Sequence, residues 1–439
     1  MSYIDDYNDN VNNKKIPYDD IPISRNYESK KSSRRQMSST PVTKILIVLV
    51  AVLFVANIVL CSTAFYYLKH GKVKNVNYYY PQIEANQESI STYAMTTALM
   101  STICVSAGGN ATDYDSFFTH TLSKGSGVIY RVDGNVIYFI TCYHVVNGHD
   151  NIWVLLPSQR VPIKVSMVSY SSHYDIAVLS YRASNPDDVL DGCTPIKTYD
   201  SNYLTMGDKV FAVGNPLSGG FSITEGVVSR INTLITIDSN NYESREIQTS
   251  TAINPGNSGG GLFNAEGRFV GLVNAKLNST KSGTTTITVA GMAYAIPGTL
   301  TLSIAESIIK NKSKTQRVDL GAVFGYDDDR GSTVYSVKDE FGTTKMILAS
   351  YVVVSSVTRG SIAYQKLHAG DQIVSIEFDV LEKGERVHKK IQMFSKYTFE
   401  DYSFAIVSGS NIIFNIIEDG IGEEEKQVVI EASAFRTIE

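Results

Sequence analysis

The hydrophobic residues of this chain fall into one long run near the amino terminus and many short runs after it. Ile45 to Leu68 contains no charged residue, and a helix of this length reaches about 36 Å, enough to cross a hydrocarbon core of about 30 Å. A buried helix of a soluble domain is usually shorter and amphipathic, and the apolar region of a cleaved signal peptide is shorter and nearer the start. We therefore expect one transmembrane helix over residues 45–68.

Short segments rich in β-branched and aromatic residues follow this run. Val136–Thr141, Ile176–Leu179 and Lys209–Val213 are examples, and clusters of Gly, Asn, Asp and Ser separate them. This spacing is typical of strands in an all-β barrel or sandwich. The chain beyond the membrane segment is therefore predicted to be mainly β.

Two helices and a second β-rich unit complete the expected elements. Helices are predicted near Thr92–Met100 and, after Pro297-Gly298, near Leu300–Lys310. Polar residues then predict a linker that ends at residue 317. A smaller β-rich unit follows over residues 318–435.

The charges around the apolar run predict its orientation. Residues 1–44 are polar and are expected to form a disordered cytoplasmic tail. More Lys and Arg residues lie just before the run than just after it, which favours an amino terminus inside the cell. Residues 69–85 are predicted to be a juxtamembrane linker, and everything after them is expected to lie outside the cytoplasm, at the cell membrane.

Composition narrows the function. Hydrophobic residues make up 43% and charged residues 19%, as in an ordinary folded protein, and the formal net charge of −5 argues against nucleic-acid binding. There is no GxxxxGK[ST] loop for ATP, and the four cysteines contain no CxxC pair. His144 and His149 do not form an HExxH motif. No metal or cofactor is expected.

The first chemical motif is a serine in a glycine-rich turn, Asn254-Pro-Gly-Asn-Ser-Gly-Gly260. A tight turn exposes the Ser258 hydroxyl and brings backbone N–H groups together. The segment Gly256, Asn257 and Ser258 is therefore a candidate oxyanion hole, with the amides of Gly256 and Ser258 as donors. A short string of this kind is often only a loop, but here the glycines follow the serine as in trypsin-like enzymes.

A histidine and an aspartate accompany this serine. His144 ends an apolar strand, where a histidine is usually only a packed residue, and Asp175 opens a buried strand, where an aspartate is usually a cap. The chain order His, Asp, Ser is that of chymotrypsin, unlike the orders of subtilisin and the α/β-hydrolases. In that scheme His144 is the general base and then the general acid, Asp175 orients it, and Ser258 is the nucleophile.

These motifs resemble the HtrA (DegP/DegS-like) family of trypsin-fold serine proteases. The resemblance implies a chymotrypsin-like double β-barrel over residues 86–300, followed by a linker over 301–317. Seven segments in the family's order carry it: Gly125–Ile129, Thr141–Val146, Asp175–Leu179, Gly207–Pro216, Thr224–Ser229, Ala252–Gly260 and Gly291–Pro297.

The unit over residues 318–435 resembles a PDZ domain. Arg359–Ala363 and Leu367–Ile373 are similar to its central signature. A PDZ groove binds an extended peptide as an added strand, and loop amides hold the terminal carboxylate. An unrelated small β domain is the alternative. By the resemblance, the groove helix is Thr398–Val407, the following strand is Ile412–Ile417, and the carboxylate loop is Asp319, Leu320, Gly321 and Ala322.

Two departures from related enzymes are visible. Asn257 replaces the aspartate that pairs with a new amino terminus in digestive trypsin-like enzymes, so activity should depend on the order of the loops around Gly256 and 274–290. Ser250-Thr251 replaces the family's usual Asp-Ala. No acidic residue lies in 249–253, so the specificity pocket is expected to be small and apolar, lined by Ile253, Leu272, Val273 and Asn274.

The sequence thus predicts a membrane-tethered, ATP-independent serine endopeptidase. By resemblance it cleaves misfolded or damaged extracytoplasmic proteins and is regulated by peptide carboxy-termini at the PDZ domain. Aromatic residues 78–80 suggest a homotrimer, although a juxtamembrane aromatic belt explains them equally well. The alternatives are a signalling protease with one membrane substrate, a chaperone or scaffold with little proteolysis, and an esterase that uses the same triad.

Overall fold

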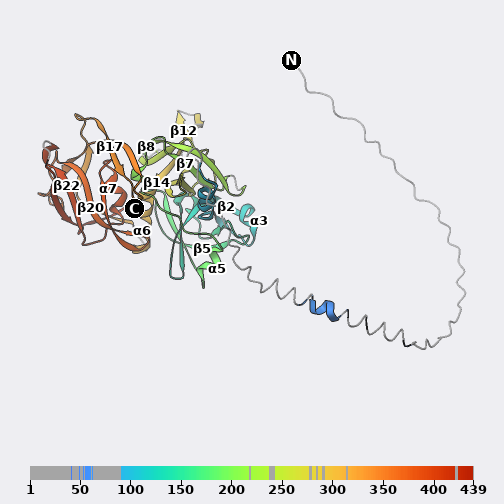
Figure 1. Cartoon of the computed structure of the whole chain (residues 1–439). Coiled ribbons are helices and arrows are strands. Elements are labelled where there is room, and N and C mark those ends of the chain that lie inside the picture. Colours follow the sequence, from blue (N-terminus) through green and yellow to red (C-terminus); the bar gives the residue numbers. More distant parts are fainter. Residues whose placement is uncertain are drawn as a thin grey trace, which may run out of the picture. The chain divides into compact units, whose positions relative to one another are not determined.

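The computed structural model divides the chain into two compact units, Met1–Tyr79 and Tyr80–Glu439 (Figure 1). Each unit is described separately. The residues that the structure describes are 41, 49, 53, 55–60 and 62 in the first unit, and 90–216, 219–236, 243–275, 279–282, 285–288, 292–312, 315–420 and 424–438 in the second.

In the first unit, the described residues of the predicted transmembrane segment are helical and exposed, Leu53 and Leu60 among them. Within the described part of the chain, no helix is long and apolar enough to cross a membrane. The rest of 45–68, nearly all of the tail 1–44, and the linker 69–85 with its three tyrosines lie outside the described residues. The anchor, the tail and the trimer therefore stay predictions.

The second unit begins with a closed six-stranded barrel. Its antiparallel strands follow the order β1-β2-β3-β6-β5-β4. Helix α2 precedes the barrel at the predicted position, and its first turn is capped by Ser91, whose hydroxyl accepts the Ala94 N–H. The elements are α2 (Thr92–Met100), β1 (Thr102–Gly109), α3 (Tyr114–Thr119), β2 (Thr121–Asp133), β3 (Val136–Cys142), α4 (Tyr143–Val146), β4 (Ile152–Leu155), β5 (Ile163–Ser171), β6 (Ile176–Arg182) and α5 (Pro186–Leu190).

A second closed barrel follows, with the strand order β10-β11-β14-β9-β8-β7. The predicted chymotrypsin-like double barrel is therefore confirmed. Its elements are η1 (Ser201–Tyr203), β7 (Lys209–Gly214), β8 (Ser222–Thr236), β9 (Glu243–Thr249), β10 (Gly261–Asn264), β11 (Phe269–Val273), the hairpin β12 (Ser279–Ser282) and β13 (Thr285–Thr288), and β14 (Ala293–Pro297).

The apolar runs of the sequence form the barrel cores. β3 and β6 pair along their whole lengths, and Phe139, Ile140, Val178 and Leu179 are completely buried. A strand with protein on both faces needs apolar residues at consecutive positions, which explains why these runs lack the alternation of a half-exposed strand.

Helix α6 (Gly298–Asn311) lies in the region predicted as a linker. The expected helix at 300–310 is confirmed, but it is largely buried, and it contacts β6 and β11 of the barrels as well as α7 (Thr398–Ser403). After it, β15 (Thr315–Val318) pairs with β24 (Phe435–Ile438), which brings the end of the chain beside α6 (Figure 1). The stretch 301–317 is therefore mostly a packed helix and a strand, because its apolar face at Leu300, Ile304 and Ile308 is buried.

Residues 315–438, here called the C-terminal part, contain a sheet in the order β16-β19-β20-β22-β23, with β21 on β20. α7 is shorter than the predicted groove helix, and the predicted strand at 412–417 lies in β22. The PDZ class itself stays a prediction. The elements are β16 (Ala322–Tyr326), the hairpin β17 (Ser332–Lys338) and β18 (Thr344–Ser350), β19 (Val352–Val357), β20 (Gln372–Glu382), β21 (Glu385–Gln392), α7, β22 (Asn411–Ile417), η4 (Glu418–Gly420) and β23 (Lys426–Glu431).

Candidate active site

His144 lies on α4, a single turn of helix that starts where β3 ends. The apolar strand runs to Cys142, and the buried side chains of Val145 and Val146 hold the turn against the barrel. The His144 imidazole is left at the surface of the barrel, with its side chain 27% exposed. It is therefore fixed at its base and accessible at its tip.

Asp175 stands directly behind this histidine. His144 Nδ1 lies 2.6 Å from Asp175 Oδ2, and the His144 backbone N–H donates to Oδ1 at 2.8 Å. The Asp175 carbonyl oxygen accepts the Tyr143 N–H at 2.9 Å. An ionised carboxylate only accepts hydrogen bonds, so it places the ring proton on Nδ1 and leaves Nε2 as an acceptor. This is the orientation that a general base requires.

Ser258 lies in the predicted glycine-rich turn, between β9 and β10. Its carbonyl oxygen accepts the Ser126 N–H at 2.8 Å, and the next residue, Gly259, donates its N–H to Val273. Gly259 has φ +83°, and a Cβ there would lie 2.2 Å from the Ser126 carbonyl oxygen. Only glycine fits, which explains the residue that follows the serine.

The Ser258 hydroxyl is bonded to a backbone amide in this structure. Its Oγ accepts the Ala275 N–H at 3.3 Å, and within the described residues no hydrogen bond joins it to His144. The side chain is 5% exposed. The Ser258–His144 hydrogen bond must therefore form when a substrate binds, since catalytic hydrogen bonds are often long or poorly aligned in enzymes without a bound substrate.

Two of the three predicted oxyanion-hole residues keep a free amide. Among the described residues, none accepts the N–H of Gly256 or Ser258. The Asn257 N–H donates to the Asn254 carbonyl oxygen at 3.0 Å, so it is not available to an oxyanion. Asn257 therefore supplies no free donor here, and the oxyanion hole stays a prediction.

Ser126 fixes the orientation of this turn, a role that the sequence did not reveal. Its hydroxyl donates to the Gly256 carbonyl oxygen at 2.7 Å and accepts the Asn215 N–H at 2.8 Å. Because the Gly256 carbonyl is bonded to Ser126, the turn keeps the N–H groups of Gly256 and Ser258 in place. The Gly-Ser-Gly string at 125–127 was noted only as a family motif, and the contact spans distant parts of the chain.

Replacing Ser126 by alanine is expected to lower kcat about tenfold with little change in KM. The loss of a buried bridging hydroxyl costs roughly 1–3 kcal/mol and frees the Gly256 peptide. Steady-state kinetics on a chromogenic peptide would measure this. Ser106→Ala is the matched control, since the Ser106 hydroxyl also donates to a buried carbonyl, that of Phe117 at 3.2 Å. An equal loss in both variants would contradict the role.

The four predicted pocket residues are buried. Leu272 packs in the main core cluster, while Ile253 and Val273 pack in the core of the second barrel. Their side chains therefore belong to the barrel interior. Asn274 precedes Ala275, whose N–H donates to the Ser258 hydroxyl. The Asn274 N–H donates to the Tyr294 carbonyl oxygen. Residues 276–278, 283–284 and 289–291, in the loop expected to influence activity, lie outside the described residues.

A buried carboxyl group, Glu246 of β9, lies close to this site. Ser244 Oγ donates to its Oε1 at 2.7 Å, Asn274 Nδ2 approaches the same oxygen at 3.4 Å, and Oε2 has no partner among the described residues. Burial, followed by the nearby charge of Asp175, raises the pKa of Glu246 to about 8. The carboxyl is therefore largely protonated at neutral pH. Nothing in the sequence pattern marked it.

Cys142, His144 and Asp175 hold potential metal ligand atoms within 4.8 Å of one another. The His144 nitrogen and the Asp175 oxygen in this group already share a hydrogen bond, and the Cys142 thiol lies 3.4 Å from the Val273 carbonyl oxygen. This geometry suits a catalytic pair better than a metal site. Cys104, Cys142 and Cys193 are buried free thiols, which answers the question of pairing that the spacing left open.

The predicted PDZ carboxylate loop lies between β15 and β16. Asp319 Oδ1 accepts the Gly321 N–H at 3.1 Å, and the carbonyl oxygens of Leu320 and Gly321 accept N–H groups of Ala363 and Thr358. Ala322 begins β16. One loop amide, that of Gly321, is thus already bonded to the Asp319 carboxylate, and peptide binding by this loop stays a prediction.

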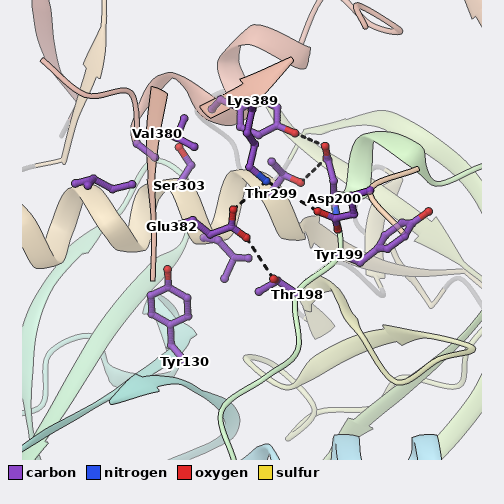
Figure 2. A pocket seen from close by; sticks show the side chains of 14 residues that line it. Tyr130, Thr198, Tyr199, Asp200, Thr299, Ser303, Val380, Glu382 and Lys389 are labelled. Carbon is purple, nitrogen blue, oxygen red and sulfur yellow. Dashed lines mark hydrogen bonds and ion pairs between the residues drawn. The ribbon is translucent and has the colours of Figure 1, made fainter. Parts of the chain in front are cut away.

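A separate small cavity lies beside α6, between the barrels and the C-terminal part (Figure 2). It holds about 50 Å³, and its polar groups bond one another: Lys389 Nζ lies 2.9 Å from Glu382, and Thr299 donates to Asp200 at 3.0 Å. None of its lining residues belongs to the His144, Asp175 and Ser258 group. Room for little more than water argues against a substrate site.

Two closed barrels, a His–Asp pair and a serine in a glycine-rich turn are the features of a trypsin-like peptidase domain. Residues 125–272 match the family model of the trypsin-like peptidase domain. The predicted class of enzyme, a serine endopeptidase, is thereby supported.

The predicted resemblance to HtrA serine proteases is also confirmed. Serine protease Do-like HtrA of Lactococcus lactis subsp. lactis (strain IL1403) is 35% identical over 260 residues, which is 58% of this chain and 60% of the relative. The protein of the same name from Lactobacillus helveticus is 32% identical over 274 residues, 61% of this chain and 62% of the relative. These matches span less than two thirds of the relatives' lengths. A solved HtrA-type protease AlgW with tripeptide is 23% identical, with a TM-score of 0.43, and the match covers 77% of this chain and 95% of that chain.

Proposed function

We propose that this chain is an ATP-independent serine endopeptidase that acts through an acyl-enzyme. The observation that carries the proposal is the fixed His144–Asp175 pair, 2.6 Å apart, together with Ser258 in a turn with two free N–H groups. A chance arrangement of core residues would not leave these amides without partners.

The geometry assigns a role to each group. His144 Nε2 removes the proton of the Ser258 hydroxyl, and Oγ attacks the peptide carbonyl carbon. The N–H groups of Gly256 and Ser258 stabilise the resulting oxyanion. His144 then protonates the leaving amine, and a water molecule, activated in the same way, hydrolyses the ester. Asp175 holds the ring and stabilises the imidazolium without taking its proton.

The proposal extends to the setting of the enzyme. The uncharged run 45–68 supports a membrane anchor, with the protease outside the cytoplasm, and the sheet and α7 of the C-terminal part support a peptide-binding PDZ domain that regulates cleavage. The relatives' designation as Do-like HtrA proteases supports misfolded or damaged proteins as substrates.

The activity is tested with the full-length chain in mild detergent. A serine-directed fluorophosphonate is expected to label the protein once, at Ser258 by peptide mapping, and to stop its cleavage of casein. Omission of ATP and addition of a chelator are expected to change neither result. Casein cleavage that persists after complete labelling would show that Ser258 is not the nucleophile.

A further inference from the structure

The turn that carries Asp175 has a strained backbone. Asp175 has φ +54°, in the left-handed region that non-glycine residues seldom adopt. Such a conformation persists only where the surroundings hold it. On one side, the pairing of Ser171 with Ile176 and the bonds to Tyr143 and His144 provide this support.

Support on the other side comes from the C-terminal part. Tyr174, the residue before Asp175, donates its hydroxyl to Glu400 Oε1 at 2.7 Å. Its ring packs edge-on against Phe404, with centroids 5.4 Å apart. Tyr174, next to the catalytic aspartate, is therefore anchored through both its ring and its hydroxyl. The residues that anchor it lie more than 200 positions away in the sequence.

Glu400 is itself held in place. Arg317 Nη1 lies 2.7 Å from the same Oε1, and each side chain is 28% exposed. His173 also faces this pair: burial lowers its pKa, while Glu400 opposes and Arg317 adds to that shift. On the same helix, Asp401 forms an ion pair with Arg245 of β9, so α7 contacts the barrels at two neighbouring points.

We propose that Glu400 is a positioning residue for the catalytic aspartate. Acting through Tyr174, it holds the strained turn 172–175 so that Asp175 faces His144, and full turnover therefore needs the C-terminal part in place. This inference rests on the proposed peptidase function.

The same helix also packs into the core of the C-terminal part through Phe399. The Phe399 ring packs on Phe324 of β16, with centroids 6.0 Å apart. Phe399 contacts β16, and the next residue, Glu400, contacts Tyr174. One turn of α7 therefore connects the C-terminal sheet to the turn that carries Asp175. If α7 served only to dock the C-terminal part on the barrels, it would not need to contact Tyr174, the residue beside the catalytic aspartate.

The test compares Tyr174→Phe, which removes one hydroxyl and keeps the ring, with Glu400→Ala and Glu400→Gln in the full-length chain. We expect Tyr174→Phe and Glu400→Ala to lower kcat on a chromogenic peptide roughly tenfold, with KM unchanged within about twofold. Fluorophosphonate labelling should slow in parallel. Glu400→Gln keeps an acceptor oxygen for Tyr174 and should restore most of the rate. The double variant should be no slower than the slower single one.

Lys345→Ala is the matched control. It removes another ion pair between the C-terminal part and the barrels, Lys345 with Asp208 at 3.0 Å, far along the chain from the Asp175 turn. It should leave kcat unchanged. Wild-type rates in Tyr174→Phe and Glu400→Ala, or an equal loss in Lys345→Ala, would overturn the positioning role while leaving the peptidase intact. A wild-type chain that is neither labelled nor active would instead overturn the proposed function, and this inference with it.

Discussion

Ser258→Ala is expected to lower kcat/KM for peptide hydrolysis by about a millionfold, close to the background rate. The variant keeps the turn, since the Ser258 backbone bonds to Ser126 and the Gly259 bond to Val273 are unaffected. It loses the hydroxyl oxygen that the proposed acyl-enzyme mechanism requires. Prolonged incubation with casein, followed by mass spectrometry of the products, would measure the residual rate.

Ser303→Ala is a suitable control for this prediction. Ser303 is a buried serine of α6 whose hydroxyl has no hydrogen-bond partner among the described residues, so its removal should leave activity unchanged. Cleavage by Ser258→Ala at the wild-type rate would exclude the serine mechanism. An undiminished ability of this variant to prevent aggregation of an unfolded protein would favour the chaperone as a second activity of the chain.

Glu246→Gln is expected to make the folded chain more stable at alkaline pH. A glutamate ionises near 4.5 in the unfolded chain, whereas burial raises the pKa of Glu246 to about 8 in the folded chain. Between these values folding takes up a proton, so stability is fully present below pH 4.5 and falls as the pH rises toward 8. The total loss is roughly 4–5 kcal/mol if the shift acts in full.

The measurement is the urea midpoint of wild type and variant from pH 5 to pH 9, followed by tryptophan and tyrosine fluorescence. The two proteins should be similar near pH 5 and diverge steadily up to about pH 8, with the variant more stable. Glu385→Gln, at an exposed position, should behave as the wild type throughout. Parallel curves for Glu246→Gln and wild type would contradict a buried, protonated carboxyl.

The barrels and the triad residues could be predicted from the sequence because their signals are local. A run of apolar residues such as 136–141 predicts a strand that is buried on both faces. A serine among glycines predicts a tight turn. Ser126, Glu246 and the contact between Tyr174 and Glu400 could not, since each depends on which distant segments meet in the fold. The Ser258 rotamer is likewise decided by a neighbour, Ala275, that no motif contains.

The region predicted as a linker, 301–317, contains the end of α6 and the strand β15. Polar residues at 310–317 indicated a linker, whereas the apolar residues of the preceding helix are buried against the barrels and α7. Asn257 lies in the predicted oxyanion segment, but its N–H closes the turn onto the Asn254 carbonyl oxygen, a bond of the i to i+3 kind that depends on the turn geometry.

The position of helix α6 links the folding of the barrels to that of the C-terminal part. Its buried face closes the barrels at β6 and β11 and also meets α7 and β15. The barrels and the C-terminal part each keep a hydrophobic core of their own, and this buried helix packs against both parts. They are therefore not interchangeable modules, and a change in the C-terminal sequence that altered α7 would have to be matched on α6 for both halves to remain folded.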